Sequence, residues 1–149
     1  MKIINRKFHR EYQSLEKYEA GIQLTGAEVK SVKAGHIKLD DSFVRILGSE
    51  AYLINAHIQI YEYARGQDYD DKRTRKLLLH KKEILKIKTK IKSGSGLTVA
   101  PVSCYNKHGI VKLEVALVRA RKDIEKRKLE KKRDKVMEEK REAKEYLKY

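Results

Sequence analysis

The stretch that decides the fold is residues 110–118, which read IVKLEVALV. Apolar residues occupy every second position from Val111 to Leu117, and Lys112 and Glu114 lie between them. Successive side chains of a β-strand point to opposite faces of the sheet, so this alternation predicts a strand with one face turned toward a core. The stretch therefore favours a fold in which antiparallel strands have one buried and one solvated face.

Further strands are predicted on the N-terminal side of this stretch. Residues 97–105 are rich in apolar and β-branched side chains, and a turn that ends in Gly109 joins them to the strand predicted over 110–118. Similar runs predict a strand that begins at Tyr12 and ends near Gly21, and strands over 42–47 and 51–57, with Gly48 marking a hairpin turn between the last two. These runs are short and closely spaced, which is typical of a small antiparallel barrel.

Two short helices are predicted between the strands. Thr25 and Glu28 have the spacing of a capping box, in which a threonine hydroxyl and a glutamate carboxylate satisfy the first free backbone amides. This motif predicts a helix over 26–34. Isoleucines that recur three and seven residues after Ile84 predict a second helix over 81–92.

The remaining segments predict loops and a charged tail. Residues 62–76 are polar and show no periodicity, which predicts a long loop. The fold class we expect is mainly β: a small antiparallel barrel over residues 1–118 with two or three short helices. Residues 119–149 contain many charges, few apolar groups and helix-forming residues throughout, so we expect a basic, partly disordered tail that is only partly helical in water and becomes helical on a partner.

The charge and cysteine counts exclude several classes of function. The chain has 149 residues with 36 Lys and Arg against 21 Asp and Glu, a net charge of +15 that favours a polyanionic partner. Nucleic acid is the first expectation and an anionic membrane surface the second. Cys104 is the only cysteine, so it forms no internal disulfide, and we expect it to be a core residue. The five histidines are scattered, and no catalytic, metal or cofactor motif appears. The chain shows neither a secretory signal nor a membrane-spanning run, so we expect a cytoplasmic protein.

Basic clusters and tyrosines together favour RNA. Lys and Arg neutralise phosphates, and tyrosine rings offer faces on which unpaired bases stack. Residues 1–118 contain seven tyrosines: Tyr12, Tyr18, Tyr52, Tyr61, Tyr63, Tyr69 and Tyr105. About half of these seven are expected to fill the core instead of binding RNA. No recognition helix or zinc finger appears, so structured or single-stranded RNA is favoured over duplex DNA.

Several specific strings resemble one known family. They include YEAGI at 18–22, LTGAEVKS at 24–31 and RKLLLHKKEI at 75–84, and further matches follow in the same order over about the whole chain. The sequence resembles the bacterial SsrA-binding protein family, also called small protein B. Any one string alone would be a weak signal, but the three together are highly specific.

The resemblance implies a non-enzymatic adaptor of trans-translation with an OB-fold-type barrel and no cofactor. Such an adaptor is monomeric and binds the tRNA-like domain of transfer-messenger RNA around its D-loop and elbow. Together with elongation factor Tu, the complex is delivered to stalled ribosomes, where the basic tail enters the decoding centre and the vacant mRNA channel. The alternative is a general ribosome-associated or single-strand RNA-binding OB protein without an adaptor role.

Site residues follow from the resemblance and from charge. Asn5, Glu19 and Leu78 match RNA-binding positions of the family. On charge grounds, the further residues expected to bind RNA are Arg6, Lys7, Lys30, Lys33, Arg75 and Lys76. The expected ribosome-binding residues of the tail are Lys122, Ile124, Lys126, Arg127, Lys131, Lys132 and Arg133. At Ile124 the family usually has an aromatic ring or histidine, and at Ala120 a glycine, so the stacking contact and the hinge of the tail depart from the pattern.

Overall fold

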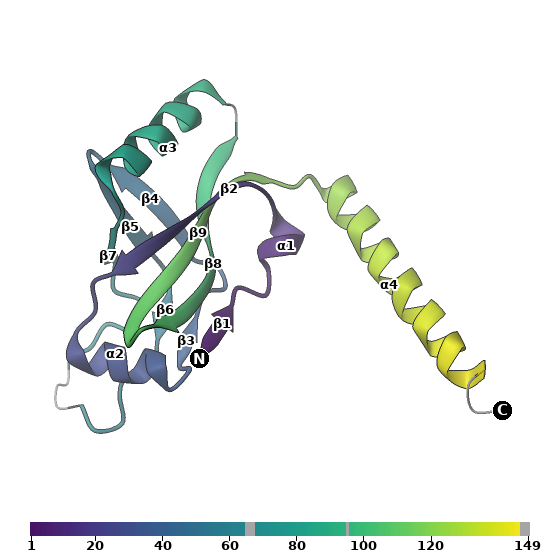
Figure 1. The fold of residues 1–149 in the computed structure, drawn as a ribbon, viewed down its shortest axis with the longest axis horizontal. Coiled ribbons are helices and arrows are strands. Elements are labelled where there is room, and N and C mark those ends of the chain that lie inside the picture. Colours follow the sequence, from purple (N-terminus) through teal and green to yellow (C-terminus); the bar gives the residue numbers. More distant parts are fainter. Residues whose placement is uncertain (65–67, 95, 147–149) are drawn as a thin grey trace.

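The computed structural model describes residues 1–64, 68–94 and 96–146, and Figure 1 shows their arrangement. The described strands are β1 (Lys2–Ile4), β2 (Tyr12–Ile22), β3 (Ile37–Lys38), β4 (Phe43–Leu47), β5 (Glu50–Ile54), β6 (His57–Ile58), β7 (Arg75–Leu78), β8 (Leu97–Lys107) and β9 (Ile110–Ala120). The described helices are α1 (Phe8–Glu11), α2 (Gly26–Lys33), α3 (Lys81–Ser93) and α4 (Asp123–Tyr146). The fold is therefore mixed, with more helix than the mainly β class predicted from the sequence.

Most strands belong to one antiparallel sheet in the order β1-β8-β4-β5-β7-β2-β9. Strand β8 also pairs with β9, so the pairings that lead from β8 through β4, β5, β7 and β2 to β9 return to β8. The predicted hairpin around Gly109 is confirmed, because β8 and β9 pair from Lys107 and Ile110 at the turn to Leu97 and Arg119 at the far end. Strands β3 and β6 form a separate pair beside α2.

The stretch 110–118 forms the predicted strand, with one face turned toward the core. Leu113, Val115 and Leu117 are at most 1% exposed and belong to the main core. Cys104 is also fully buried in this core, as predicted. On the opposite side of the sheet, Phe8 of α1 packs on a smaller cluster and covers one end of β8 and β9. The remainder of that outer side carries exposed or half-exposed side chains, among them Lys112, Tyr105 and the apolar Leu78.

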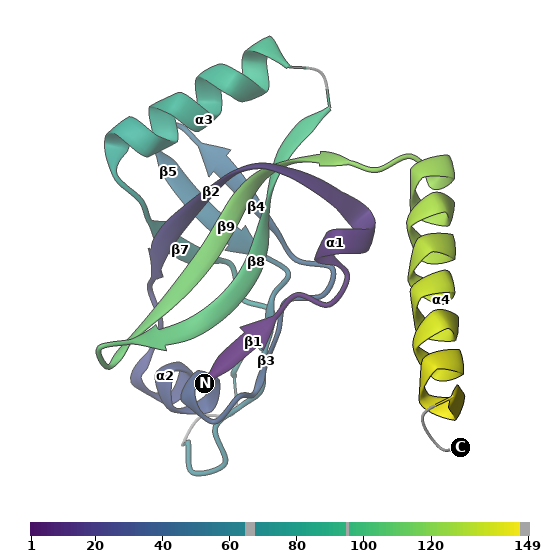
Figure 2. The same ribbon diagram turned by 45° about the vertical axis from the view of Figure 1, so that its right-hand side comes forward.

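The two predicted helices are confirmed with nearly the predicted bounds. The capping box begins α2: the Glu28 amide donates to the Thr25 hydroxyl oxygen over 3.2 Å, and the Thr25 amide donates to the Glu28 carboxylate over 3.0 Å. Ile84 and Ile87 are the buried residues of α3. Figures 1 and 2 show that α3 lies across one end of the sheet and α2 across the other.

The predicted loop over 62–76 is wrong at its C-terminal end. Arg75 and Lys76 are the first residues of β7, which pairs with β5 and β2. The polar sequence concealed this strand because Arg75, a charged residue, occupies an inward position. Residues 65–67 of the predicted loop lie outside the described residues.

The tail differs most from the prediction. After β9 the chain forms one continuous helix of 24 residues, α4, where partial disorder was expected. Helix-forming residues without Gly or Pro favour it, and two ion pairs hold its first turns near α1: Lys126 to Glu11 at 2.8 Å and Glu130 to Arg10 at 2.9 Å. Figures 1 and 2 show α4 standing apart from the sheet. None of the described helices, α4 included, is long and apolar enough to cross a membrane.

Candidate RNA-binding surface

A row of outward residues crosses five strands of the sheet. Lys2 of β1 lies opposite Tyr105 of β8, which lies opposite Lys112 of β9. Lys112 lies opposite Gly21 of β2, and Gly21 lies opposite Leu78 of β7. Paired residues share one face of a sheet, so this row presents two cations, an aromatic ring and an apolar side chain side by side. We call this row, with its neighbours Glu19 and Lys107, the sheet face.

Glu19 lies on the sheet face beside this row. Its carboxylate accepts hydrogen bonds from the Tyr105 hydroxyl and, over 3.3 Å, from the Lys107 ammonium group. The hydrogen bond from Tyr105 and the nearby charge of Lys107 lower the pKa of Glu19, which keeps the carboxylate ionised. The carboxylate therefore orients an aromatic ring and a cation at the surface.

Leu78 owes its position to the glycine opposite. A Cβ atom on Gly21 would lie 3.2 Å from the Leu78 Cβ, closer than ordinary packing allows. Leu78 is 52% exposed although it is a large apolar residue. The structure thus brings the predicted residues Glu19 and Leu78 to one face. Lys2, Lys107 and Lys112 were not among the predicted site residues, because only the strand register shows that they join this face.

Asn5 has a different position from the one expected of a base contact. It is only 4% exposed, its Nδ2 donates to the Pro101 carbonyl over 2.9 Å, and its Oδ1 accepts from the Lys7 amide over 3.3 Å. Both ends of the side-chain amide are therefore engaged within the protein. Asn5 fixes the turn that presents the exposed side chains of Arg6 and Lys7, and Lys7 in turn pairs with Asp41 at 3.1 Å.

Arg75 is not available as a phosphate partner, which corrects the sequence prediction. Its side chain is fully buried, and its guanidinium group binds Glu28 of α2 through Nε at 2.8 Å and Nη2 at 2.6 Å. Its Nη1 donates to the Ala56 carbonyl over 3.0 Å. Burial alone would raise the pKa of Glu28, but the Thr25 amide and the two arginines, Arg73 and Arg75, lower it to about 2. Arg75 is thus the ionic link between α2 and β7.

The other predicted cations remain at the surface in two places. Lys30 and Lys33 are exposed on α2, and the Lys30 ammonium group lies 5.4 Å from the centre of the Tyr61 ring. Lys76 lies on the same face of β7 as Leu78, two residues away, and is half-buried in an ion pair with Glu50 at 3.0 Å. Leu78 and Lys76 are therefore neighbours, whereas the α2 lysines form a separate basic area.

A basic groove lies between α1 and α4. Its volume is about 780 Å³. Its lining residues are Arg6, His9, Arg10, Arg121, Leu129, Glu130, Lys132, Arg133, Val136, Met137 and Lys140. It brings Arg6, expected to act with the body of the protein, together with Lys132 and Arg133 of the tail. Among the other predicted tail residues, Lys126 is held by Glu11, and Ile124 is 68% exposed.

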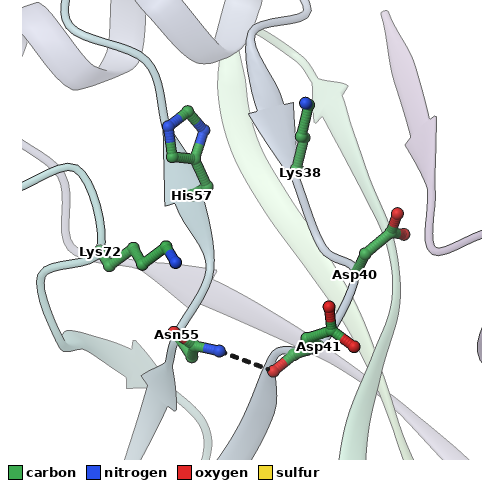
Figure 3. Close-up of a pocket in the computed structure, with 6 residues that line it drawn as sticks. All are labelled: Lys38, Asp40, Asp41, Asn55, His57 and Lys72. Carbon is green, nitrogen blue, oxygen red and sulfur yellow. Dashed lines mark hydrogen bonds between the residues drawn. The ribbon is translucent and has the colours of Figure 1, made fainter.

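A second hollow carries balanced charges (Figure 3). It has a volume of about 340 Å³ and is lined by Lys38, Asp40, Asp41, Asn55, His57 and Lys72. The Asn55 side-chain amide donates to the Asp41 carbonyl over 3.0 Å and closes one side, as Figure 3 shows. Two lysines face two aspartates here, so net charge does not attract a polyanion to this hollow.

The described residues contain no group of three or more histidine, cysteine or acidic side chains that could hold a metal. Burial raises the pKa of the Cys104 thiol to about 12, so this thiol is a poor nucleophile. The sheet face, the α2 lysines and the basic groove together define a nucleic-acid-binding protein, in which cations lie beside aromatic and apolar side chains.

Comparison with known proteins identifies the family. The sequence model of the SmpB protein family matches residues 2–145. An SsrA-binding protein of Sulfurihydrogenibium sp. (strain YO3AOP1) is 49% identical over 130 residues, which are 87% of this chain and 85% of that protein. An SsrA-binding protein of Pseudothermotoga lettingae is 44% identical over 148 residues, 99% of this chain and 97% of the relative. The chain belongs to the SmpB family of SsrA-binding proteins.

A solved structure supports this assignment. It is described as "tmRNA-SmpB: a journey to the center of the bacterial ribosome" and matches with a TM-score of 0.67 at 40% identity. The match covers 82% of this chain and 85% of the solved chain. The resemblance inferred from the strings YEAGI, LTGAEVKS and RKLLLHKKEI is therefore confirmed.

Proposed function

We propose that this protein binds transfer-messenger RNA and acts with it on the ribosome in trans-translation, as a non-enzymatic RNA-binding adaptor. The observation that carries this proposal is the sheet face, where the register places Glu19 and Leu78 beside Lys112 and Tyr105. The charges attract the RNA, while Leu78 and the hydrogen-bonding groups on the face supply contacts that depend on the shape of the partner.

The sheet face is the part that contacts the tRNA-like domain of transfer-messenger RNA. Lys2 and Lys112 contact phosphates, Leu78 packs under a base, and Glu19 holds Tyr105 and Lys107 in place for their own contacts. Asn5 acts indirectly, because its buried amide fixes the backbone from which Arg6 and Lys7 project. The closed circuit of strand pairings supports the further proposal that the sheet is an OB-type barrel, a fold used by many RNA-binding domains.

The tail contacts ribosomal RNA. Its exposed cations include Lys122, Arg127, Lys131, Lys132 and Arg133, which project from or lie just before α4. On the ribosome this helix enters the decoding centre and the vacant mRNA channel, and elongation factor Tu accompanies the complex during delivery. The adaptor acts as a monomer in the cytoplasm, where the ribosomes are.

Competition binding tests the choice of partner. Labelled transfer-messenger RNA is bound to the full chain and challenged with bulk tRNA or with single-stranded RNA. We expect both competitors to displace it poorly. If either competes as well as unlabelled transfer-messenger RNA, the chain is a general RNA-binding protein and the adaptor role is refuted.

A salt series tests the contacts of the sheet face. Each phosphate contact contributes roughly 0.7 to 0.9 to the slope of log affinity against log salt concentration. Lys112→Ala should reduce the slope by about that amount. Lys92→Ala, which removes an exposed lysine from the last turn of α3, fourteen residues after Leu78, is the matched control and should leave the slope unchanged. Equal slopes for the two variants would exclude the sheet face as the RNA contact.

Truncation tests the division of labour between body and tail. A chain that ends after Lys122 keeps all of β9 and the bond from the Arg121 amide to the Glu11 carbonyl. We expect it to bind transfer-messenger RNA with nearly normal affinity and to fail in tagging on stalled ribosomes. Loss of RNA binding and tagging to the same extent would contradict the division.

A further inference from the structure

Most of the seven tyrosines in the body of the protein, residues 1–118, make contacts that stabilise the fold. Four hydroxyl groups donate to protein oxygens, those of Tyr18, Tyr52, Tyr69 and Tyr105. The ring of Tyr12 packs on Phe8 with 5.8 Å between ring centres, at the edge of the smaller core cluster. These contacts give five of the seven body tyrosines a role in stabilising the fold. Tyr61 and Tyr63 are left, and both lie outside the core clusters of the described residues.

Tyr61 and Tyr63 form an aromatic pair on a short turn. Their ring centres are 5.5 Å apart in an edge-to-face arrangement, and Tyr63 is 75% exposed. The Ala64 amide donates to the Tyr61 carbonyl over 2.9 Å, which closes the turn and holds Tyr63 at its tip. Among the described residues, no acceptor or donor is bonded to either hydroxyl group. The exposed ring of Tyr63 thus has no role in the packing of the described structure.

This turn is fixed to the basic side of α2. The Ser31 hydroxyl donates to the Gln59 carbonyl over 2.6 Å, just before the turn begins. The Lys30 ammonium group lies 5.4 Å from the centre of the Tyr61 ring, within the range of a cation–π contact. Lys33 follows one helical turn after Lys30 and is exposed on α2. Two cations and two aromatic rings therefore lie on elements that are held together by a hydrogen bond.

We propose that Tyr61 and Tyr63 form a stacking platform for an unpaired nucleobase of RNA, with Lys30 and Lys33 contacting the phosphates next to that base. The proposal rests on the proposed function, because it assumes that the polyanionic partner is RNA, and it adds a second contact away from the sheet face. Stacking on an exposed ring needs no particular base edge, so the platform accepts any base that the RNA leaves unpaired.

The lysines favour RNA over an apolar peptide as the occupant of the platform. A peptide that packs on Tyr63 would gain little from two cations beside the rings, whereas each nucleotide brings one flat base together with one negative charge. Glu62 is the one acidic residue within the turn between the two tyrosines, and it is exposed to solvent, so it leaves the cationic side on α2 unneutralised.

Fluorescence of a stacked base tests the platform directly. The probe is a single-stranded RNA of about twelve nucleotides that carries one 2-aminopurine, whose emission is quenched when it stacks on an aromatic ring. We expect the full wild-type chain and Tyr63→Phe to quench the probe. Tyr63→Ala should lose the quenching and bind transfer-messenger RNA about tenfold more weakly, because removal of one stacking ring weakens binding by roughly 5- to 150-fold.

The same variants separate this inference from the proposed function. Tyr63→Ala removes a neutral group, so the salt slope of binding should stay as in the wild type, whereas Lys30→Ala should lower it by roughly 0.7 to 0.9. Absence of quenching with the wild-type chain, or equal affinity and quenching of Tyr63→Ala and the wild type, would overturn the platform. Failure of transfer-messenger RNA to outcompete bulk tRNA would instead refute the proposed function while the quenching experiment still decides the platform.

Discussion

The buried ion pair between Glu28 and Arg75 gives the sharpest test of how this structure is held together. Glu28 is 1% exposed, Arg75 is fully buried, and their closest nitrogen and oxygen atoms are 2.6 Å apart. Glu28→Gln keeps the size of the side chain and removes its charge. The variant therefore leaves a buried guanidinium group without its counterion, which typically costs about 3–5 kcal/mol of folding free energy.

The lowered pKa of Glu28 leads to a similar magnitude. Its value of about 2 lies below the ordinary 4.5, and each pKa unit corresponds to about 1.36 kcal/mol. The ionised carboxylate thus contributes about 3 kcal/mol to the free energy of unfolding at neutral pH. Because the pKa is depressed in the folded state, this contribution is present above about pH 4.5 and is lost as the pH falls toward 2.

Urea unfolding at pH 7 measures the effect. We expect Glu28→Gln to lower the free energy of unfolding by at least about 3 kcal/mol, equivalent to a fall in melting temperature of roughly 6–12 °C. Glu62→Gln removes an exposed carboxylate by the same substitution and should change stability by less than about 0.5 kcal/mol. A loss below 1 kcal/mol for Glu28→Gln would refute the reasoning. So would a loss of stability between pH 4.5 and 2 that is equally large in the wild type and in Glu28→Gln.

Three other perturbations follow from the packing. Asn5→Ala removes the hydrogen bonds to the Pro101 carbonyl and from the Lys7 amide and should destabilise the fold by about 1–3 kcal/mol in urea unfolding; an unchanged midpoint would show that Asn5 is not structural. Gly21→Ala places a Cβ atom 3.2 Å from the Leu78 Cβ, so we expect weaker binding of transfer-messenger RNA at nearly unchanged secondary structure in circular dichroism. Cys104 should react with a thiol reagent only on unfolding, because it is buried and its pKa is raised to about 12; rapid labelling at pH 7 would contradict this.

Local sequence patterns predicted the elements that depend on local interactions. The capping box of Thr25 and Glu28 and the alternation after Gly109 both appear in the structure at the predicted places. The same capping box shows where local reasoning stops. One oxygen of Glu28 caps α2, but the other binds Arg75 from a strand 47 residues away, and no local pattern specifies that contact.

The candidate site shows the same limit. Arg75 was predicted to contact phosphates on the ground of its charge, yet its partner Glu28 on α2 makes its burial possible. Glu19 and Leu78 came from the family resemblance, and the sequence alone could not show that they share a face. That requires the pairing of Gly21 with Leu78, which only the folded sheet establishes. The tail was predicted from its own composition, and its contacts with Glu11 and Arg10 were not foreseeable.

The pairing of β2 with β9 also constrains how this chain is made. Tyr12 lies opposite Ala120, so a strand synthesised early must wait for one synthesised near the end before the sheet can close. Contacts between such distant segments form slowly, and until then the edges of β2 and β8 are open to wrong partners. During translation α4 is synthesised after β9, so closure can begin while this helix is still emerging. A protein whose family works on stalled ribosomes thus depends, for its own folding, on translation that proceeds past its last strand.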